Sequence, residues 1–264
     1  MNIEKIAENI NILANFCGKR DVPFLTQEAV FPKYGIKQAD IMVLFGGSII
    51  CGGDILAEGM KNSIAKRYII VGGIGHTTDS LKTAVNKKYP EILTKDKSEA
   101  EVFQLYLEKK YNFKVDFLEC RSTNCGNNIT FLLDLIKKED IPCESIILVQ
   151  DATMQHRMEA VLRKYRNDIK IINYAAYSIT VIDKGERLIF ENNISGMWEM
   201  EKYISLLMGE IPRLRDDENG YGPLGYNYID HVDIPYEVEK AFSELKTEYK
   251  KLIREANPIF ASEK

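Results

Sequence analysis

The segment Arg121-Ser-Thr-Asn-Cys-Gly-Asn-Asn128 lies between two apolar runs and decides how the chain around it folds. The run before it, residues 113–118, has the length and composition of a short buried strand. After it, apolar residues recur at helical spacing, at Ile129, Leu132, Leu133 and Ile136. The sequence therefore predicts a strand, a polar turn and a helix in succession.

The polar turn has the residues both to begin this helix and to bind a ligand. Ser122, Thr123 and Asn124 are N-cap candidates, because their side chains accept hydrogen bonds from the unpaired amides of a first helical turn. Asn128 adds a further amide donor and acceptor. A helix N-terminus that follows a strand favours an anionic or carboxylate-bearing ligand. Taken alone, the segment is equally compatible with a turn that only caps its helix.

Four further apolar runs have the continuous hydrophobic character of strands that are buried on both faces. These runs cover residues 41–45, 68–71, 145–149 and 169–173, and helical segments lie between most of them. Strands that alternate with helices predict right-handed crossovers and a parallel sheet. We therefore expect an α/β fold whose sheet has about five parallel strands, with residues 114–118 as one of them.

Glycine-rich or polar turns follow several of these predicted strands. Besides the opening segment, the turns begin with Gly46-Gly47, Gly72-Gly73-Ile74-Gly75 and Gln150-Asp151. In a parallel sheet, ligands bind beyond the carboxyl ends of the strands, where such turns gather. The expected binding site is this edge of the sheet.

The remaining helices are predicted from amphipathic spacing and from caps. Helices are expected from residue 3 to 13, from 55 to 64, after Ser98, from near Thr153 through about Lys164, around 198–207 and from 238 to 252. Residues 18–39 are predicted to link the first helix to the first strand. The stretch that ends at Lys97 is polar, and no regular structure is predicted before it. We expect residues 1–174 to form the α/β domain and residues 175–264 a helical C-terminal part that packs on the sheet edge.

One segment of that C-terminal part has an unusual composition. Residues 212–225 combine a run of alternating charge with Gly, Pro and Tyr, which predicts a shaped loop more than a free linker. We expect residues 212–233 to fold against the carboxyl edge of the sheet. That packing would bring Arg213 or Arg215 near the glycine turns.

The composition and the motifs of the chain argue against several classes of function. A net charge of −4 argues against a nucleic-acid-binding surface, which needs clustered Lys and Arg. The chain has no apolar run of the roughly 20 residues that span a bilayer and no secretory signal at its N-terminus, so we expect a cytoplasmic protein without a membrane partner. Five cysteines without C-x-x-C pairs argue against a disulfide framework or a structural zinc site. The turn Gly72-Gly73-Ile74-Gly75 lacks the G-x-G-x-x-G spacing of dinucleotide-binding loops, and the chain has no G-x-x-x-x-G-K-[ST], which argues against a P-loop NTPase.

Three side chains in the turns are candidates for a role in catalysis or ligand binding. His76 follows the second glycine turn and is a candidate base or ligand contact, although a structural histidine fits as well. Cys125 stands at a helix N-terminus, where a thiol can become a nucleophile, but a packed thiol is the favoured interpretation. Arg157 is placed to meet a carboxylate or a phosphate, with a surface salt bridge as the alternative. No spacing of histidines predicts a metal site.

These motifs resemble the YdcF-like proteins, a family of unknown reaction that also includes SanA and ElyC. The matching segments are Gly46-Gly47, Gly72 through His76, Ser98-Glu99-Ala100, Ser122 through Asn128, Val149 through Asp151, Thr153 through Arg157, Pro212 through Pro223 and His231 through Asp233. The chain departs from the wider family at Cys125, Asn127 and Met154, where Thr, Glu and His are usual. The resemblance runs along nearly the whole chain.

The resemblance implies a cytosolic Rossmann-like domain that binds S-adenosyl-L-methionine, with a helical C-terminal part. It implies no particular reaction or oligomeric state. The expected ligand-binding residues are Gly46, Gly47, Gly73, Gly75, His76, Glu99, Ser122, Thr123, Asn124, Asn128, Asp151, Arg157 and Arg213. In this scheme the glycines leave room for the ligand, and Arg157 pairs with its carboxylate.

Two other classes of function fit the same residues. The first is a hydrolase or transferase that acts on a phosphorylated or nucleotide-like small molecule, with His76 or Asp151 as base. The second is a structural or regulatory protein whose turns merely pack and whose charged tail contacts a partner.

Overall fold

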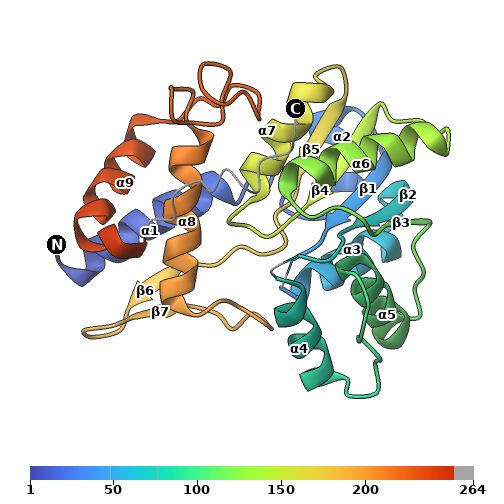
Figure 1. Ribbon diagram of the computed structural model, residues 1–264, viewed down its shortest axis with the longest axis horizontal. Helices are drawn as coiled ribbons and strands as arrows, with labels where there is room; N and C mark the ends of the chain where they lie inside the picture. Colours follow the sequence, from blue (N-terminus) through green and yellow to red (C-terminus); the bar gives the residue numbers. More distant parts are fainter. Residues whose placement is uncertain (48, 76, 253–264) are drawn as a thin grey trace.

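The computed structural model describes residues 1–47, 49–75 and 77–252 (Figure 1). Its centre is a five-stranded, fully parallel sheet with the strand order β3-β2-β1-β4-β5. The strands are β1 (Ala39–Phe45), β2 (Ala65–Val71), β3 (Phe117–Glu119), β4 (Ser145–Val149) and β5 (Lys170–Asn173). The predicted Rossmann-like α/β fold is confirmed.

The central strand β1 shows why these runs form a parallel sheet. All seven of its residues are buried. Successive side chains of a strand point to opposite faces, and accordingly Met42 and Leu44 join one hydrophobic cluster while Ile41 and Val43 join the other. Both faces of β1 are therefore covered, as the continuous apolar run predicted.

The first face of the sheet is covered by α3 (Cys51–Lys61) and α5 (Glu99–Tyr111), with α4 (Thr78–Lys88) beside α5 (Figure 1). Glycines let α3 approach the sheet closely. A Cβ on Gly52 would lie 2.9 Å from Leu44 Cδ1, and one on Gly59 would lie 2.8 Å from Met42 Cε. Larger residues at these two positions would push the helix away from β1.

The second face is covered by α6 (Cys125–Lys138) and α7 (Gln155–Tyr165). Residues 212–233 pack on the same side, since Leu214, Ile229 and Val232 belong to this cluster. The backbone N–H of Asp230 donates to the carbonyl of Ala160 in α7, at 2.9 Å. The segment is folded, as expected, and its anchor is α7.

The N-terminal helix α1 (Ile3–Cys17) packs with the C-terminal part of the chain (Figure 1). Its neighbours there are α8 (Met200–Leu214), α9 (Tyr236–Glu248) and the antiparallel pair β6 (Val181–Asp183) and β7 (Leu188–Phe190). Asn11 holds β6 through two 2.8 Å hydrogen bonds with the backbone of Val181, and Asn9 donates to Glu244 at 2.8 Å. The first helix and the elements of residues 181–248 therefore form one group beside the sheet. The division at residue 174 stays a prediction.

The strand predicted at residues 114–118 is shorter in the structure and begins later in the chain, at Phe117. Gln104 of α5 explains the difference, because its side chain donates to the carbonyl of Phe113 at 3.1 Å and accepts from the N–H of Val115 at 3.0 Å. This backbone is therefore bonded to a helix. The N–H of Asp116 then donates to the carbonyl of Tyr68 in β2 at 2.9 Å, and the strand register with β2 runs from Phe117 to Glu119.

Two helices lie where the sequence predicted irregular chain. The first is α2 (Gln27–Tyr34), which Thr26 caps and Gly35 ends in the left-handed conformation, at φ 69°. It includes Pro32, the residue that favoured a link. The second is α4, whose buried apolar residues are only Leu81 and Val85, too few for a clear helical period. The pair β6 and β7 was likewise not predicted, and α8 continues through Pro212 to Leu214.

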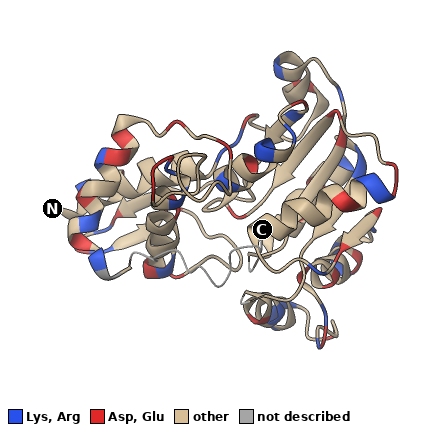
Figure 2. Cartoon of the chain, turned by 45° about the horizontal axis from the view of Figure 1, so that its top comes forward, with Lys and Arg blue, Asp and Glu red and all other residues tan. Residues whose placement is uncertain are grey.

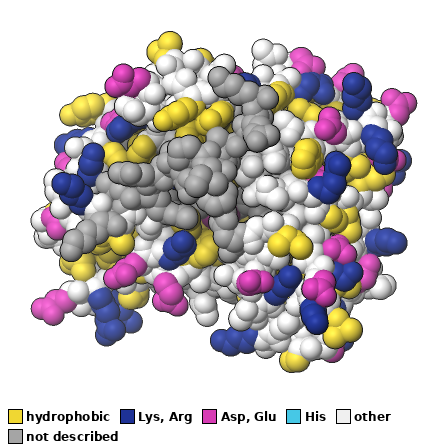
Figure 3. Space-filling view, viewed as in Figure 1, with side chains coloured by type: hydrophobic (Ala, Val, Ile, Leu, Met, Phe, Trp, Pro, Cys, Tyr) yellow, Lys and Arg dark blue, Asp and Glu magenta, His cyan; other side chains and the backbone are white. Residues whose placement is uncertain are grey.

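Charged residues of both signs are interspersed over the helices (Figure 2). The face seen in Figure 3 likewise shows Lys and Arg side by side with Asp and Glu. Among the helices that the structure describes, none is long and apolar enough to cross a membrane. The expectation that nucleic acid is not a partner stays a prediction.

His156 joins α7 to the end of α1. Its Nδ1–H donates to the carbonyl of Phe16 at 2.9 Å, and the two rings meet edge to face at 4.6 Å. Burial, followed by the charge of Lys19, lowers the pKa of His156 to about 4. The neighbouring Glu159 and Arg163 act in opposite directions on this pKa. The folded protein therefore holds this imidazole neutral at pH 5.

We predict that His156 makes the protein less stable at mildly acidic pH. The unfolded chain takes up a proton near pH 6.5, whereas the folded chain resists it down to about pH 4, so stability falls as the pH drops through this window. Between pH 7 and pH 5 the loss should be about 2 kcal/mol. Urea unfolding of the wild type and of His156→Gln at both pH values measures it, and the variant should lose correspondingly less.

His231 provides the control with the opposite sign. It is exposed between Asp216 and Asp233, which raise its pKa. Its contribution to stability is complete below pH 6.5 and fades as the pH rises through its folded pKa. His231→Gln should therefore steepen the loss of stability at pH 5. An unchanged pH dependence in His156→Gln would contradict the assignment to His156.

Candidate functional site

The strand order reverses between β1 and β4. The chain leaves β1 toward α3 on the first face of the sheet and leaves β4 toward α7 on the second face. The two outgoing loops therefore part, and a crevice forms between them at the carboxyl edge. This position is where open α/β sheets bind their ligands, so the candidate site is centred on it.

The crevice is lined by the ends of both strands and by the start of α3. Its walls include Phe45, Gly47, Gly52, Gln150 and Asp151. Its free volume is about 10 Å³, close to the space that one water molecule needs. A Cβ on Gly47 would meet Gln150 Oε1 at 3.7 Å, so among the described residues no packing contact requires glycine there.

The side chain of Asp151 accepts hydrogen bonds from several residues at this edge. Its Oδ1 accepts hydrogen bonds from the N–H of Thr153 at 2.9 Å, from the Thr153 hydroxyl at 2.8 Å and from the Tyr177 hydroxyl at 2.8 Å. Its Oδ2 accepts from the indole Nε1–H of Trp198 at 2.9 Å. Asp151 is buried, and it connects the end of β4 with the chain that follows β5.

Glu99 supplies a second buried carboxylate to the same edge. It opens α5, whose predicted cap is confirmed, since Ser98 and Glu101 form a reciprocal capping box. The N–H of Glu99 donates to the carbonyl of Gly73 at 3.0 Å, which fixes the helix start against the loop after β2. Its Oε1 accepts from the hydroxyls of Thr77 at 2.8 Å and Thr78 at 3.0 Å.

The four glycines expected to leave room for a ligand divide into two pairs. A Cβ on Gly46 would lie 2.9 Å from Cβ of Glu99, and one on Gly73 would collide with the carbonyl oxygen of Ser122. Protein atoms therefore fill the space beside these two residues. At Gly47 and Gly75 the nearest atoms are 3.7 Å from the added Cβ, an ordinary contact. Only this second pair leaves space of the kind that the sequence predicted for all four.

The opening segment forms the turn and helix that the sequence predicted. Asn124 is the N-cap, and its Oδ1 accepts from the N–H of Asn127 at 2.9 Å. The buried Glu119 shapes the turn by accepting from the N–H groups of Arg121 at 2.9 Å and Ser122 at 3.1 Å. Ser122 is a buried residue, 2% exposed. Its hydroxyl has no hydrogen-bond partner among the described residues.

The remaining residues of this segment play smaller parts. The carbonyl of Thr123 faces Gly75, and the N–H of Asn128 donates to the carbonyl of Asn124 at 2.8 Å within the first turn of α6. Burial raises the pKa of Cys125, so its sulfur is a protonated thiol at neutral pH. This agrees with a packed thiol and disfavours a nucleophile.

Arg157 pairs with a residue of the protein itself. Its Nε and Nη2 donate to the two carboxylate oxygens of Glu210 in α8, at 2.5 and 3.0 Å. Both side chains are largely buried, so the pair is charge-neutral and bidentate. The sequence predicted that Arg157 pairs with the carboxylate of a ligand. In the structure Arg157 pairs with the carboxylate of Glu210.

The sequence predicted that Arg213 or Arg215 lies near the glycine turns. Arg215 forms a bidentate pair with Glu239 and covers the ring of Phe242 in α9, 5.1 Å from its centroid. The carboxylate that Arg215 contacts thus belongs to α9. Arg213 donates to the carbonyl of Gly209 in its own helix, and its charge acts on Cys125 at the start of α6.

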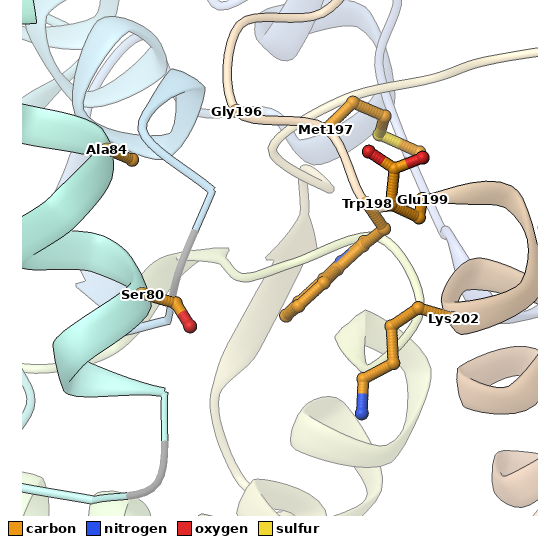
Figure 4. Close-up of a pocket in the computed structure, with 7 residues that line it drawn as sticks. All are labelled: Ser80, Ala84, Gly196, Met197, Trp198, Glu199 and Lys202. Atoms are coloured by element: carbon orange, nitrogen blue, oxygen red, sulfur yellow. The ribbon is translucent and has the colours of Figure 1, made fainter. Parts of the chain in front are cut away.

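A larger pocket of about 260 Å³ adjoins this edge, between α4 and residues 196–202 (Figure 4). Trp198 forms part of its wall and also donates to Asp151, so the pocket and the crevice share a boundary. The sequence alone did not indicate Trp198 as a ligand-binding residue, because its apolar spacing placed it in a predicted helix. Its one distinguishing signal was that the chain has a single tryptophan.

His76 lies outside the described residues. Within the described ranges, no group of three or more His, Cys, Asp or Glu side chains is arranged to hold a metal ion. No protein-family model matches the chain. The resemblance to the YdcF-like proteins therefore rests on the motifs quoted above.

We predict opposite responses to alanine at two glycines of this edge. Gly73→Ala should lower the free energy of unfolding by about 1–3 kcal/mol, because the added methyl meets the backbone of residues 121–122. Gly47→Ala, the matched change in open space, should alter it by no more than about 0.5 kcal/mol. Urea unfolding of both variants checks this, and equal stabilities would contradict the packing role of Gly73.

Proposed function

We propose that this protein binds S-adenosyl-L-methionine at the carboxyl edge of the sheet, across the crevice between β1 and β4. The resemblance to the YdcF-like proteins suggests the ligand, and the strand order suggests the place. A location in the cytoplasm belongs to the same proposal. The five cysteines, all free thiols, are consistent with a reducing compartment.

The observation that carries the proposal is the pair of buried carboxylates on either side of Gly46-Gly47. Glu99 lies against Gly46, while Asp151 follows Gln150, the neighbour of Gly47. Negative charge at this point favours a sulfonium cation, and carboxylate oxygens accept hydrogen bonds from ribose hydroxyls. Asp151 Oδ2 accepts a hydrogen bond from Trp198, and a carboxylate oxygen can accept a second one.

The same charges disfavour the phosphorylated substrate that was the alternative. Two buried carboxylates repel a phosphate group, and the guanidinium of Arg157 is already neutralised by Glu210. Cys125 is a protonated thiol, so it offers no ready nucleophile. The proposal is accordingly confined to binding.

We predict that Asp151→Asn weakens the binding of S-adenosyl-L-methionine by about 10- to 150-fold. The change removes the negative charge and one acceptor of a charge-assisted hydrogen bond, which contributes about 1.5–3 kcal/mol. Titration calorimetry with S-adenosyl-L-methionine and its demethylated product measures the affinity. ATP and inorganic phosphate are titrated beside them.

Asp40→Asn is the matched control. Asp40 is a buried carboxylate at the opposite end of β1, where it accepts from the N–H groups of Glu144 and Ser145 at 2.9 and 3.0 Å. This variant should be less stable but should bind with wild-type affinity. Tight binding of ATP or phosphate together with silence toward both methionine compounds would overturn the proposal in favour of the phosphorylated substrate.

A further inference from the structure

Trp198, the single tryptophan of the chain, lines the 260 Å³ pocket beside the crevice. Figure 4 shows its indole extending into the space between α4 and α8. Ser80 and Ala84 of α4 lie across from it, and Met197 and Lys202 belong to its own side. An aromatic face, two small residues and a thioether therefore surround one space.

The indole is held in place before any ligand arrives. Its Nε1–H donates to Asp151 at 2.9 Å, and the next residue, Glu199, is the N-cap of α8. Asp151 is itself held by Thr153 and Tyr177. A side chain fixed in this way loses little conformational freedom on binding, so stacking on it is correspondingly favourable.

The size of the pocket limits what it can take. Pockets that enclose a whole drug-sized ligand measure about 300–1,000 Å³, so about 260 Å³ suits one part of such a ligand. An aromatic wall with apolar neighbours favours a planar ring, because ring faces stack and thioethers contact ring edges well. The remainder of the ligand would continue toward Asp151, which the pocket and the crevice have in common.

We propose that this pocket is a subsite for a planar heteroaromatic ring of purine size, which stacks on the indole of Trp198. The inference rests on the proposed function, in which the ring is the adenine of S-adenosyl-L-methionine. Asp151 then contributes to the binding of both parts of the ligand. It orients the indole on which the ring stacks, and it lines the crevice toward which the rest of the ligand extends. Trp198 is the specificity-determining residue for the base.

The single tryptophan makes the test direct, because its emission reports on this pocket alone. Adenosine, S-adenosyl-L-methionine and L-methionine are titrated separately into the full chain while tryptophan fluorescence is recorded. Adenosine and S-adenosyl-L-methionine should change the emission with saturation, and L-methionine should not. Calorimetry of the same titrations shows whether each compound binds at all.

Two substitutions separate stacking from positioning. Trp198→Leu removes the aromatic face and should weaken adenosine binding about 5- to 150-fold, the range for loss of one base–aromatic stack. Trp198→Phe keeps a ring but loses the bond to Asp151, and it should retain most of the affinity. Tyr236→Leu, at a side chain 80% exposed on α9, is the aromatic-to-aliphatic control and should bind like the wild type.

The outcomes distinguish this inference from the proposed function. Calorimetric binding of S-adenosyl-L-methionine without any change in Trp198 emission, or with undiminished affinity in Trp198→Leu, overturns the ring subsite and leaves the proposed function standing. Equal losses in Trp198→Leu and Trp198→Phe also overturn it, because Trp198 would then act only through Asp151. An absence of binding by all three compounds overturns both.

Discussion

The carboxylate of Asp151 joins two parts of this molecule that are distant in sequence. It lies at the start of the loop after β4, and it accepts hydrogen bonds from Tyr177 and Trp198, which belong to the chain beyond β5. A buried carboxylate without such partners would carry a large desolvation cost. The donors therefore have to remain in place, and with them the segment that leads into α8. The position of the C-terminal part over the carboxyl edge depends on this contact.

The second connection between these parts is the buried pair of Arg157 and Glu210. It joins the start of α7 to α8 through two hydrogen bonds. Removal of either partner would leave an uncompensated buried charge, which is more costly than loss of the pair as a whole. The pair also affects the electrostatics of the edge, because Glu210 compensates the positive charge of Arg157.

The loops at this edge show that glycine does not always mark an open site. Gly46 and Gly73 allow three loops to pack against each other, since Glu99 and the backbone of Ser122 occupy the space of their missing side chains. Gly47 and Gly75 have room beside them. The distinction concerns contacts between loops that follow different strands. It is therefore a property of the assembled edge.

The sequence by itself determined the parallel sheet, the caps at Ser98 and Asn124 and the edge where the turns meet. These features follow from periodicity and from hydrogen bonds between residues three or four positions apart, which a local segment contains in full. Only the tertiary structure decided the partner of Arg157, the position of Trp198 and the shortening of β3. The first two depend on residues 53 and 47 positions away, and β3 was shortened because Gln104 of a neighbouring helix took its backbone bonds. No local pattern records such pairings, because they arise only when separate elements are packed together.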